Sequence, residues 1–394
     1  MVTTTAAARP PTGPGRGAAP DAPSRTGRTT GPGRGAAPDA PSRTGRKRLS
    51  SSRDFRLWYL ARSISLGGSA ASAIAIPLLT YQASGSATLT AAVAALEALP
   101  YLLLGLFAGA AWGALTRIVG RQRLAEANSA LWATEVVLQI SVPAGAGLLA
   151  AVTDPSIVIC LDAGSYLVSA ALIAALRGDI DPARRTAARV RAEIAEGLRY
   201  LWSQPVVRTL SLTGFALSMT VGGALGLLVV QAHQGLGLAT HDTRIGLLYS
   251  AGACGSLAGA LLLPRVTRLA GAGPASILGY AVNAVCLAGF AVARTLPVAM
   301  AVWAVWYVAT TTAITNGISV RQQVTPDALQ GRVNTTGRML AWGGTPFGAL
   351  LGGVLAGAAG TRVAYLALVV PVAVGLAALL LSPVRRLRTP QLAT

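Results

Sequence analysis

The chain has few charged residues and almost no lysine for its length. Charged residues make up 12% of its 394 residues against 53% hydrophobic ones, and its mean hydropathy is +0.54. One soluble domain of this size needs a more polar surface, so the composition predicts a helical protein that crosses the membrane many times. The net charge of +19 comes from 32 Arg and one Lys set against 14 acidic residues. The positions of those arginines decide what the charge means.

Residues suited to enzyme chemistry are also scarce. The three cysteines all lie in apolar segments and are interpreted as small buried side chains, not as a disulfide or a metal site. His233 and His241 have no cysteine or carboxylate set around them, which argues against zinc. The sequence has no phosphate-binding G-x-x-x-x-G-K-[ST] loop and no serine-nucleophile motif. We therefore expect no enzyme activity, no cofactor and an ion gradient as the energy source.

Residues 1–52 are rich in Pro, Gly, Ala and Arg and lack apolar periodicity, which predicts a disordered tail. The sequence TGPGRGAAPDAPSRTGR occurs at 12–28 and again at 30–46, a repeat typical of recent duplication. Its Arg-Gly content is compatible with binding to RNA or anionic lipid. A solvated tail that helps to hold the N-terminus in the cytoplasm is the favoured interpretation. No early hydrophobic region follows, so no signal peptide is expected.

From Leu57 onward, apolar spans of about 20 residues recur, each long enough to cross a bilayer. The predicted spans are 57–81, 88–112, 129–152, 156–176, 207–231, 244–263, 275–293, 297–319, 335–358 and 363–381. The first four form an N-terminal bundle over 53–176, and the other six form a C-terminal bundle over 207–383. The loop between them, 177–206, contains an amphipathic segment with an apolar stripe that is expected to lie along the membrane surface. That stripe consists of Val190, Ile194, Leu198 and Leu201.

The arginines predict the orientation. With the N-terminus inside, most loop arginines face the cytoplasm, above all those of the central loop 177–206. The external loops hold only Arg244, Arg294 and Arg362, and the arginines of the tail 384–394 place the C-terminus inside as well. We therefore expect a multi-pass protein of the plasma membrane with both termini in the cytoplasm. The basic composition is then an orientation signal, which removes most of the case for nucleic-acid binding.

The stretch 321–353 joins a basic loop to a Gly-rich apolar segment. Pro326-Asp327 predicts a helix stop and a cytoplasmic turn between flanking arginines. The residues expected at this cytoplasmic gate are Arg321, Asp327 and Arg332. Glycines spaced i, i+4 leave one helix face open to a neighbouring backbone. The residues expected to mediate helix packing are Gly105, Gly109, Pro143, Pro346, Gly348 and Gly352.

Several stretches, in the right order, resemble the major facilitator superfamily, in particular its bacterial drug and siderophore exporters. RQQVTPDALQGRV at 321–333 looks like the loop between helices ten and eleven of that branch, and PFGALLGG at 346–353 like its eleventh helix. LDAGSY at 161–166 is similar to its sixth helix, LAEAN at 124–128 to the start of its fifth, and 54–79 to its first. The resemblance covers nearly everything after Arg53. It implies an all-α fold of two helical bundles that moves a small-molecule substrate.

The first bundle departs from the family pattern. The Gly-rich end of the second span, 105–113, continues directly into what looks like the end of helix four. The third helix, most of the fourth and the Asp-Arg loop between helices two and three are therefore expected to be missing, which leaves about ten transmembrane helices, four plus six. The fifth-helix motif G-P-x-x-G-G is reduced to VPAGAG at 142–147. The Gly-rich face at 105–113 makes a homodimer conceivable.

Polar side chains inside the predicted spans are candidates for the transport path, because such groups are costly in a membrane. The candidates for proton coupling or for the substrate cavity are Arg62, Glu97, Glu135, Asp162, Asn283 and Asn316. The three acids and the arginine would form a proton relay. Alternatively, Arg62 pairs with one acid, the other acids are solvated near the interfaces, and the asparagines only hydrogen-bond between helices. Trp303, Trp306 and Tyr307 are interpreted as lipid-facing or packing residues, with a place in a substrate pocket as the other alternative.

The predicted function is secondary active transport: proton-coupled efflux of small amphiphilic, drug-like or siderophore-like molecules. The expected partners are the small-molecule substrate, protons and membrane lipid. The alternative, motivated by the missing hairpin, is a decayed or accessory membrane protein without transport activity.

Overall fold

The computed structural model describes residues 52–103, 153–176, 187–240 and 242–388, together with a scattered set between 118 and 149. Within these residues all regular structure is helical, and eight helices are long and apolar enough to cross a membrane. The predicted all-α polytopic fold is confirmed. The predicted spans 88–112 and 129–152 and the position of the missing hairpin lie partly outside the described residues, as do Gly105, Gly109 and Pro143.

The first half contains α1 (Arg53–Ser84), α2 (Ala87–Leu103) and α5 (Pro155–Ala174). Ser52 caps α1 by accepting a hydrogen bond from the Phe55 N–H. Gly85, at φ 60°, ends α1 in the left-handed region, so that α2 begins two residues later. Asp154 caps α5, and hydrogen bonds from the Ser156 side chain and backbone lower the pKa of its carboxyl group. These caps fix where each helix enters and leaves the bundle.

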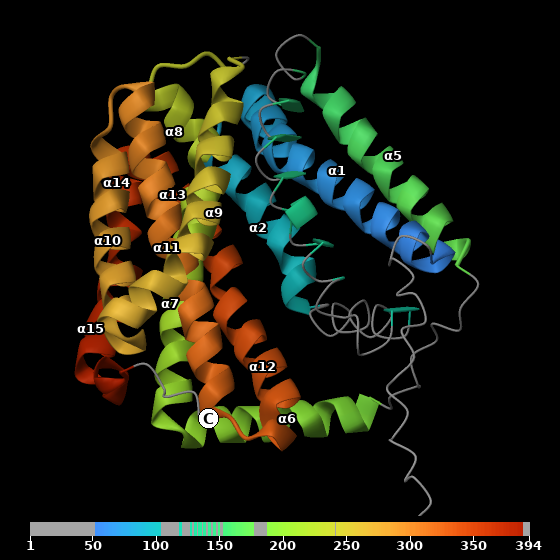
Figure 1. Cartoon of the computed structure of the whole chain (residues 1–394). Helices are drawn as coiled ribbons and strands as arrows, with labels where there is room; N and C mark the ends of the chain where they lie inside the picture. Colours follow the sequence, from blue (N-terminus) through green and yellow to red (C-terminus); the bar gives the residue numbers. More distant parts are fainter. Residues whose placement is uncertain are drawn as a thin grey trace, which may run out of the picture. The chain divides into compact units, whose positions relative to one another are not determined.

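α1 and α5 pack against each other along much of their lengths (Figure 1). The packing needs Gly68 on α1, because a Cβ there would overlap the side chains of Asp162 and Ser165 on α5. The close crossing therefore brings an acidic side chain of α5 directly against the backbone of α1.

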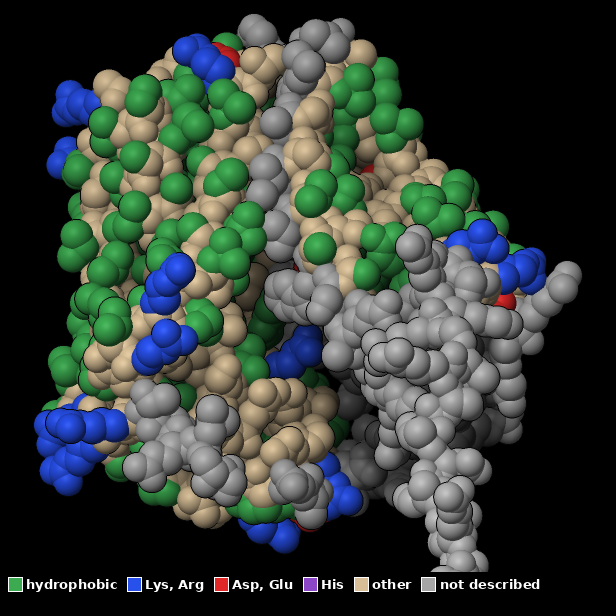
Figure 2. Space-filling model, viewed as in Figure 1, with side chains coloured by type: hydrophobic (Ala, Val, Ile, Leu, Met, Phe, Trp, Pro, Cys, Tyr) green, Lys and Arg blue, Asp and Glu red, His purple; other side chains and the backbone are tan. Residues whose placement is uncertain are grey.

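The second half contains ten α-helices and a 3₁₀ turn within 187–386. They are α6 (Ala187–Ser203), α7 (Pro205–Gly226), α8 (Leu228–Gln234), α9 (Arg244–Ala270), α10 (Ala272–Val292), α11 (Leu296–Val324), α12 (Asp327–Trp342), α13 (Gly344–Ala359), α14 (Thr361–Ala367), α15 (Val369–Leu381) and η3 (Pro383–Arg386). α12 and α13 together form one candidate span, Leu329–Ala359, and α14 and α15 form another, Thr361–Leu381. Figure 2 shows a face rich in hydrophobic side chains, with many of its Lys and Arg side chains near the end where α6 lies. That pattern suits a bundle surrounded by lipid.

α6 is the amphipathic helix of the central loop, and it packs against α7 and α12 (Figure 1). Leu201 is fully buried with Val207 and Val333, whereas Leu198, on the same predicted stripe, is 46% exposed. Gly197 faces α12 so closely that a Cβ would lie 2.9 Å from the Arg332 carbonyl oxygen. Part of the stripe therefore docks α6 onto the second half, and Leu198 stays free of that contact.

The core of the second half is aromatic. Trp303 and Trp306 on α11 stack with ring centroids 4.7 Å apart, and both are fully buried. Phe290 and Tyr365 complete the cluster from α10 and α14. Gly252 on α9 makes room for it, since a Cβ there would lie 2.7 Å from the Tyr307 ring. Of the interpretations given above for these tryptophans, the structure supports packing and not exposure to lipid.

α13 belongs to the second half but packs against α2 of the first half as well as against α7. Its glycines make this close packing possible. A Cβ at Gly348 would overlap the Met219 carbonyl oxygen of α7, and one at Gly352 would lie 3.2 Å from Leu227. Gly353 faces α2, where a Cβ would overlap Ala91. The i, i+4 spacing seen in the sequence thus corresponds to close backbone approaches on two sides of one helix.

Candidate transport site

The two halves meet at the end of the bundle where α8 lies, which we call the α8 end. The Gln234 side chain of α8 donates a hydrogen bond of 3.2 Å to the Tyr81 hydroxyl of α1. Gln82 donates to the Thr240 carbonyl oxygen at 3.2 Å, and Thr88 of α2 donates to the Gly353 carbonyl oxygen of α13 at 2.9 Å. These bonds join the first half to the second and hold this end closed.

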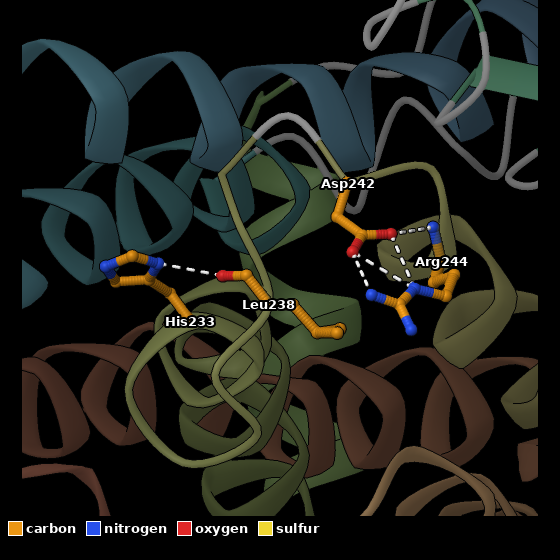
Figure 3. Close-up of polar contacts among 4 residues, drawn as sticks. All are labelled: His233, Leu238, Asp242 and Arg244. Carbon is orange, nitrogen blue, oxygen red and sulfur yellow. Dashed lines mark hydrogen bonds and ion pairs between the residues drawn. The ribbon is translucent and has the colours of Figure 1, made fainter.

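The loop between α8 and α9 belongs to this closed end. The His233 ring nitrogen Nδ1 lies 2.9 Å from the Leu238 carbonyl oxygen, and Asp242 pairs with the Arg244 guanidinium at 2.6 Å (Figure 3). Asp242 also accepts a hydrogen bond from the Arg244 backbone N–H and so positions the start of α9. His241 lies outside the described residues. In the described part of the chain, no three metal-binding side chains gather.

Glu97 lies on α2 at the boundary between the halves. It is about 15 Å along α2 from Ala87, near mid-membrane depth. The side chain is half-buried, and its Oε1 atom is buried without a hydrogen-bond partner. The carboxyl group lies within electrostatic range of Asp162 on α5 and of Tyr249 on α9, whose hydroxyl is also buried and unpartnered. One acid of the first half thus lies within electrostatic range of an aromatic residue of the second half.

Asp162 lies in the first half at the α1–α5 crossing. It accepts a hydrogen bond of 3.3 Å from the Ser165 hydroxyl. Its side chain lines a largely apolar cavity of about 350 Å³, with Gly68 and Ala71 on α1 and Leu161 beside it on α5. This volume lies within the range of ligand pockets, about 300–1,000 Å³. Asp162 and Glu97 therefore form a pair of acids with a cavity next to one of them.

Neither Glu135 nor Arg62 joins the pair of Glu97 and Asp162. Glu135 is helical and half-buried and has interactions of its own; the preceding residue, Thr134, hydrogen-bonds to the Tyr59 hydroxyl of α1. Arg62 is exposed on α1, and among the described residues no ion pair to it is found. The proposed pairing of Arg62 with an acid therefore has no support within the described part of the chain.

Asn283 and Asn316 tie α10 to α11. The Asn283 side chain donates to the Thr310 hydroxyl at 2.6 Å, while its own oxygen is buried without a partner. The Asn316 side chain donates to the Ala272 carbonyl oxygen at 2.6 Å and to the Ser276 hydroxyl at 2.8 Å. Both amides are thus engaged in interhelical hydrogen bonds.

This difference predicts unequal effects on stability. Asn316→Leu removes two satisfied bonds and is expected to lower the free energy of unfolding by about 1 kcal/mol, within the range for bonds between membrane helices. Asn283→Leu is expected to cost less, because it also removes the unpartnered oxygen. Reversible unfolding in mixed micelles measures both. An equal or larger loss for Asn283→Leu would contradict this assignment.

Of the predicted gate residues, Arg321 and Arg332 do not lie in one cluster. Arg332 on α12 pairs with Glu196 on α6 at 2.5 Å, with both side chains partly exposed. Arg321 on α11 points away from that pair and into the protein, where its guanidinium donates to the Asn334 side chain at 3.3 Å. Asp327 begins α12, and its side chain lies outside what the structure describes. Arg332 thus pairs with α6, whereas Arg321 lies in a different place.

That place is a pocket inside the second half, lined by residues of α7, α10, α11, α12, α13 and α15. Its volume is about 110 Å³. Arg321 and Arg338 supply its positive charge, and Thr213, Ser218 and Ser276 its hydroxyl groups. Most of the remaining lining is apolar, including Leu217, Trp342 and Leu379.

Sequence reasoning missed three of these residues. Glu196 is one of several charged residues of an amphipathic segment, and its partner Arg332 lies more than a hundred residues away in the sequence, so the pair could not be predicted. Tyr249 is an ordinary aromatic residue of an apolar span, and only the fold brings it near Glu97. Arg338 was read as one of several cytoplasmic arginines. Its place inside the predicted span 335–358 was the available signal.

Comparison with known proteins supports the fold and the family. Residues 110–393 match the family described as transmembrane secretion effector, within the major facilitator superfamily. The chain belongs to this family. The resemblance to major facilitator exporters drawn from the sequence is thereby confirmed. The chain is also 29% identical over 271 residues to the multidrug efflux pump Tap of Mycolicibacterium fortuitum, a match that covers 67% of this chain and 65% of the pump. The matched region thus spans just under two thirds of that relative.

Solved structures agree on the major facilitator fold. A bacterial homologue of the iron transporter ferroportin, in an inward-facing state, aligns with a TM-score of 0.66 at 14% identity, over 83% of this chain and 98% of the homologue. A bacterial homologue of the human lysosomal transporter Spinster aligns with a TM-score of 0.57 at 14% identity, over 87% and 98% of the two chains. At these identities the likeness describes the fold alone. The matched proteins are transporters rather than enzymes.

Proposed function

We propose that this chain of the transmembrane secretion effector family is a secondary active transporter that exports small amphiphilic molecules in exchange for protons. Membership of the family and the similarity to a multidrug efflux pump support transport and its outward direction. The proposed location is the plasma membrane with both termini in the cytoplasm, which the bias of arginines toward the predicted internal loops supports.

The observation that carries proton coupling is the position of Glu97. A carboxyl group with a buried, unpartnered oxygen lies at the boundary between the halves, within electrostatic range of a second acid and of Tyr249. Intramembrane acids in such places serve proton relays, because their protonation can change with the arrangement around them. Rocking of the halves would change what Glu97 faces, and this links protonation to opening. Asp162, beside the cavity of the first half, is the second member of the proposed relay.

The contacts between the halves support an inward-open state. The hydrogen bonds from α1 and α2 to the second half close the α8 end. In the proposed orientation this end faces outward, and α6 lies at the cytoplasmic surface. Export then requires these contacts to break while the opposite end closes, as in alternating access by rocking bundles.

Accumulation of a fluorescent cationic amphiphile in pump-deficient bacteria tests the proposal. The compared proteins are the intact chain, Glu97→Gln, Glu135→Gln and an empty vector, and Asp154→Asn serves as an acid-to-amide control outside the membrane. We expect the intact chain and Asp154→Asn to lower accumulation, and Glu97→Gln to match the vector at equal membrane levels. Unchanged efflux by Glu97→Gln would move the coupling site elsewhere, and a loss in Glu135→Gln alone would assign it to Glu135.

If the intact chain lowers the accumulation of no dye across a chemically broad panel, the transport proposal fails. The alternative of a membrane protein without transport activity would then be the better account.

A further inference from the structure

The most unusual charge in the described part of the second half is Arg321. Its side chain is only 3% exposed, and the Nε atom is buried without a hydrogen-bond partner. Within the described residues, its guanidinium donates one hydrogen bond, to the neutral Asn334 side chain at 3.3 Å. Arg338, which has the same sign, lines the same pocket and lies within electrostatic range of Arg321. Among the described side chains Arg321 has no counterion, and a buried cation without one is costly, so this arrangement calls for an anion.

We propose that the pocket beside Arg321 binds the anionic head of an amphiphilic molecule, a carboxylate, phosphate or sulfonate with an apolar tail. Arg321 and Arg338 both line the pocket, and no acidic side chain is found among its lining residues in the described part of the chain. Guanidinium groups match the oxygens of such heads with paired hydrogen bonds. The anion would supply the negative counter-charge for Arg321.

The rest of the pocket suits the other parts of such a molecule. The Ser276 hydroxyl accepts a hydrogen bond from Asn316 and keeps its own O–H to donate to a polar head. Apolar side chains such as Leu217 and Leu379 can contact the beginning of a tail. The volume of about 110 Å³ is well below the 300–1,000 Å³ of whole-ligand pockets. The pocket therefore holds the head and first carbons, and the remainder of the molecule lies outside it.

The guanidinium of Arg321 packs against a glycine that leaves room for it. A Cβ at Gly337 on α12 would lie 2.9 Å from Arg321 Nη1 and 3.0 Å from Cζ. Such contacts are too tight, and the flexible guanidinium is the part that would yield. Gly337→Ala therefore displaces the charge without removing it, which gives a test that does not depend on loss of the arginine.

This site goes beyond the proposed function and does not depend on proton coupling. Glu97 and Asp162 lie on α2 and α5 of the first half, and the pocket lies among helices of the second half. A binding measurement at equilibrium, without a gradient, can therefore show no binding to this pocket while proton-driven transport is observed. Likewise, binding to the pocket can be observed in the absence of proton-driven transport.

The test uses the full chain in nanodiscs of zwitterionic phosphatidylcholine and three probes with the same octyl tail. These are octanesulfonate, octanol and octyltrimethylammonium, and isothermal titration against empty nanodiscs subtracts partition into lipid. We expect octanesulfonate to bind at least about tenfold more tightly than the other two, as charge-assisted hydrogen bonds imply. Arg321→Met and Gly337→Ala are expected to abolish that preference, and Arg321→Lys to retain part of it.

Arg268→Met, on an exposed position of α9, is the matched control for loss of one positive charge and should leave the preference unchanged. Equal binding of the three probes, or an unchanged preference in both Arg321→Met and Gly337→Ala, would overturn the proposal. Addition of anionic phosphatidylglycerol to the nanodiscs distinguishes the source of the ligand. Loss of octanesulfonate binding then identifies a lipid headgroup as the occupant, and retained binding identifies a soluble amphiphile.

Discussion

Gly348→Leu is expected to leave almost no correctly folded protein in the membrane. A Cβ at this position overlaps the Met219 carbonyl oxygen, which is backbone in the middle of α7 and cannot rotate away. α13 also packs against α2, so a shift of α13 away from α7 disturbs the contact between the halves. Overpacking of this kind costs about 3 kcal/mol at the upper end of its usual range, a large part of the roughly 5–15 kcal/mol that stabilises a typical protein.

Fluorescence-detected size-exclusion chromatography of a fusion protein measures the folded fraction. Gly164→Leu is the matched control, because Gly164 is also in a membrane helix but a Cβ there meets nothing within 4 Å. The control is expected to elute like the intact chain, and Gly348→Leu in the void volume or not at all. Equal monodisperse peaks from the two variants would show that α7 and α13 do not approach as closely as described.

A disulfide between Thr88→Cys and Gly357→Cys is expected to abolish transport. A Cβ at Gly357 would lie 3.7 Å from the Thr88 Cβ, within the range of about 3.5–4.5 Å that disulfides need. The bond would lock α2 to α13 at the α8 end, so the halves could not separate there. Oxidation should reduce efflux at least about tenfold, and a reductant should restore it, since the proposed cycle requires this end to open in each turnover.

The experiment requires replacement of the three free cysteines, Cys160, Cys254 and Cys286. A disulfide between Gly226→Cys and Ala349→Cys serves as control, because a Cβ at Gly226 lies 3.5 Å from the Ala349 Cβ and both residues belong to the second half. That cross-link should leave the movement between the halves intact. Full efflux by the oxidised Thr88–Gly357 pair would mean that the α8 end does not open during transport.

The membrane-length helices and the turn between α11 and α12 could be predicted from the sequence, because each depends on the pattern of residues within its own segment. Apolar stretches of membrane length correspond to helices such as α9 and α10, and the turn at Pro326 separates α11 from α12. The glycines of α13 face neighbouring backbones because the i, i+4 spacing fixes one helix face whatever the partner. In these cases the physical requirement lies within one helix.

The contacts of the candidate site could not be predicted, because each depends on helices far apart in the chain. Arg332 was grouped with Arg321 by sequence proximity, but they lie eleven positions apart on two different helices and point to different partners. The surroundings of Glu97 include Tyr249, which only the meeting of the two halves brings near. The surroundings of Arg321 likewise depend on a second helix, because Gly337 of α12 lies against its guanidinium.

The most direct test of the central claim is transport into proteoliposomes under an imposed proton gradient. The purified full-length chain is reconstituted at matched amounts as the intact form and as Glu97→Gln, and dye uptake is followed with the gradient present and after its collapse by an ionophore. The account predicts uptake by the intact chain that stops when the gradient collapses, and no gradient-dependent uptake by Glu97→Gln. Gradient-driven uptake of equal rate by Glu97→Gln would contradict it.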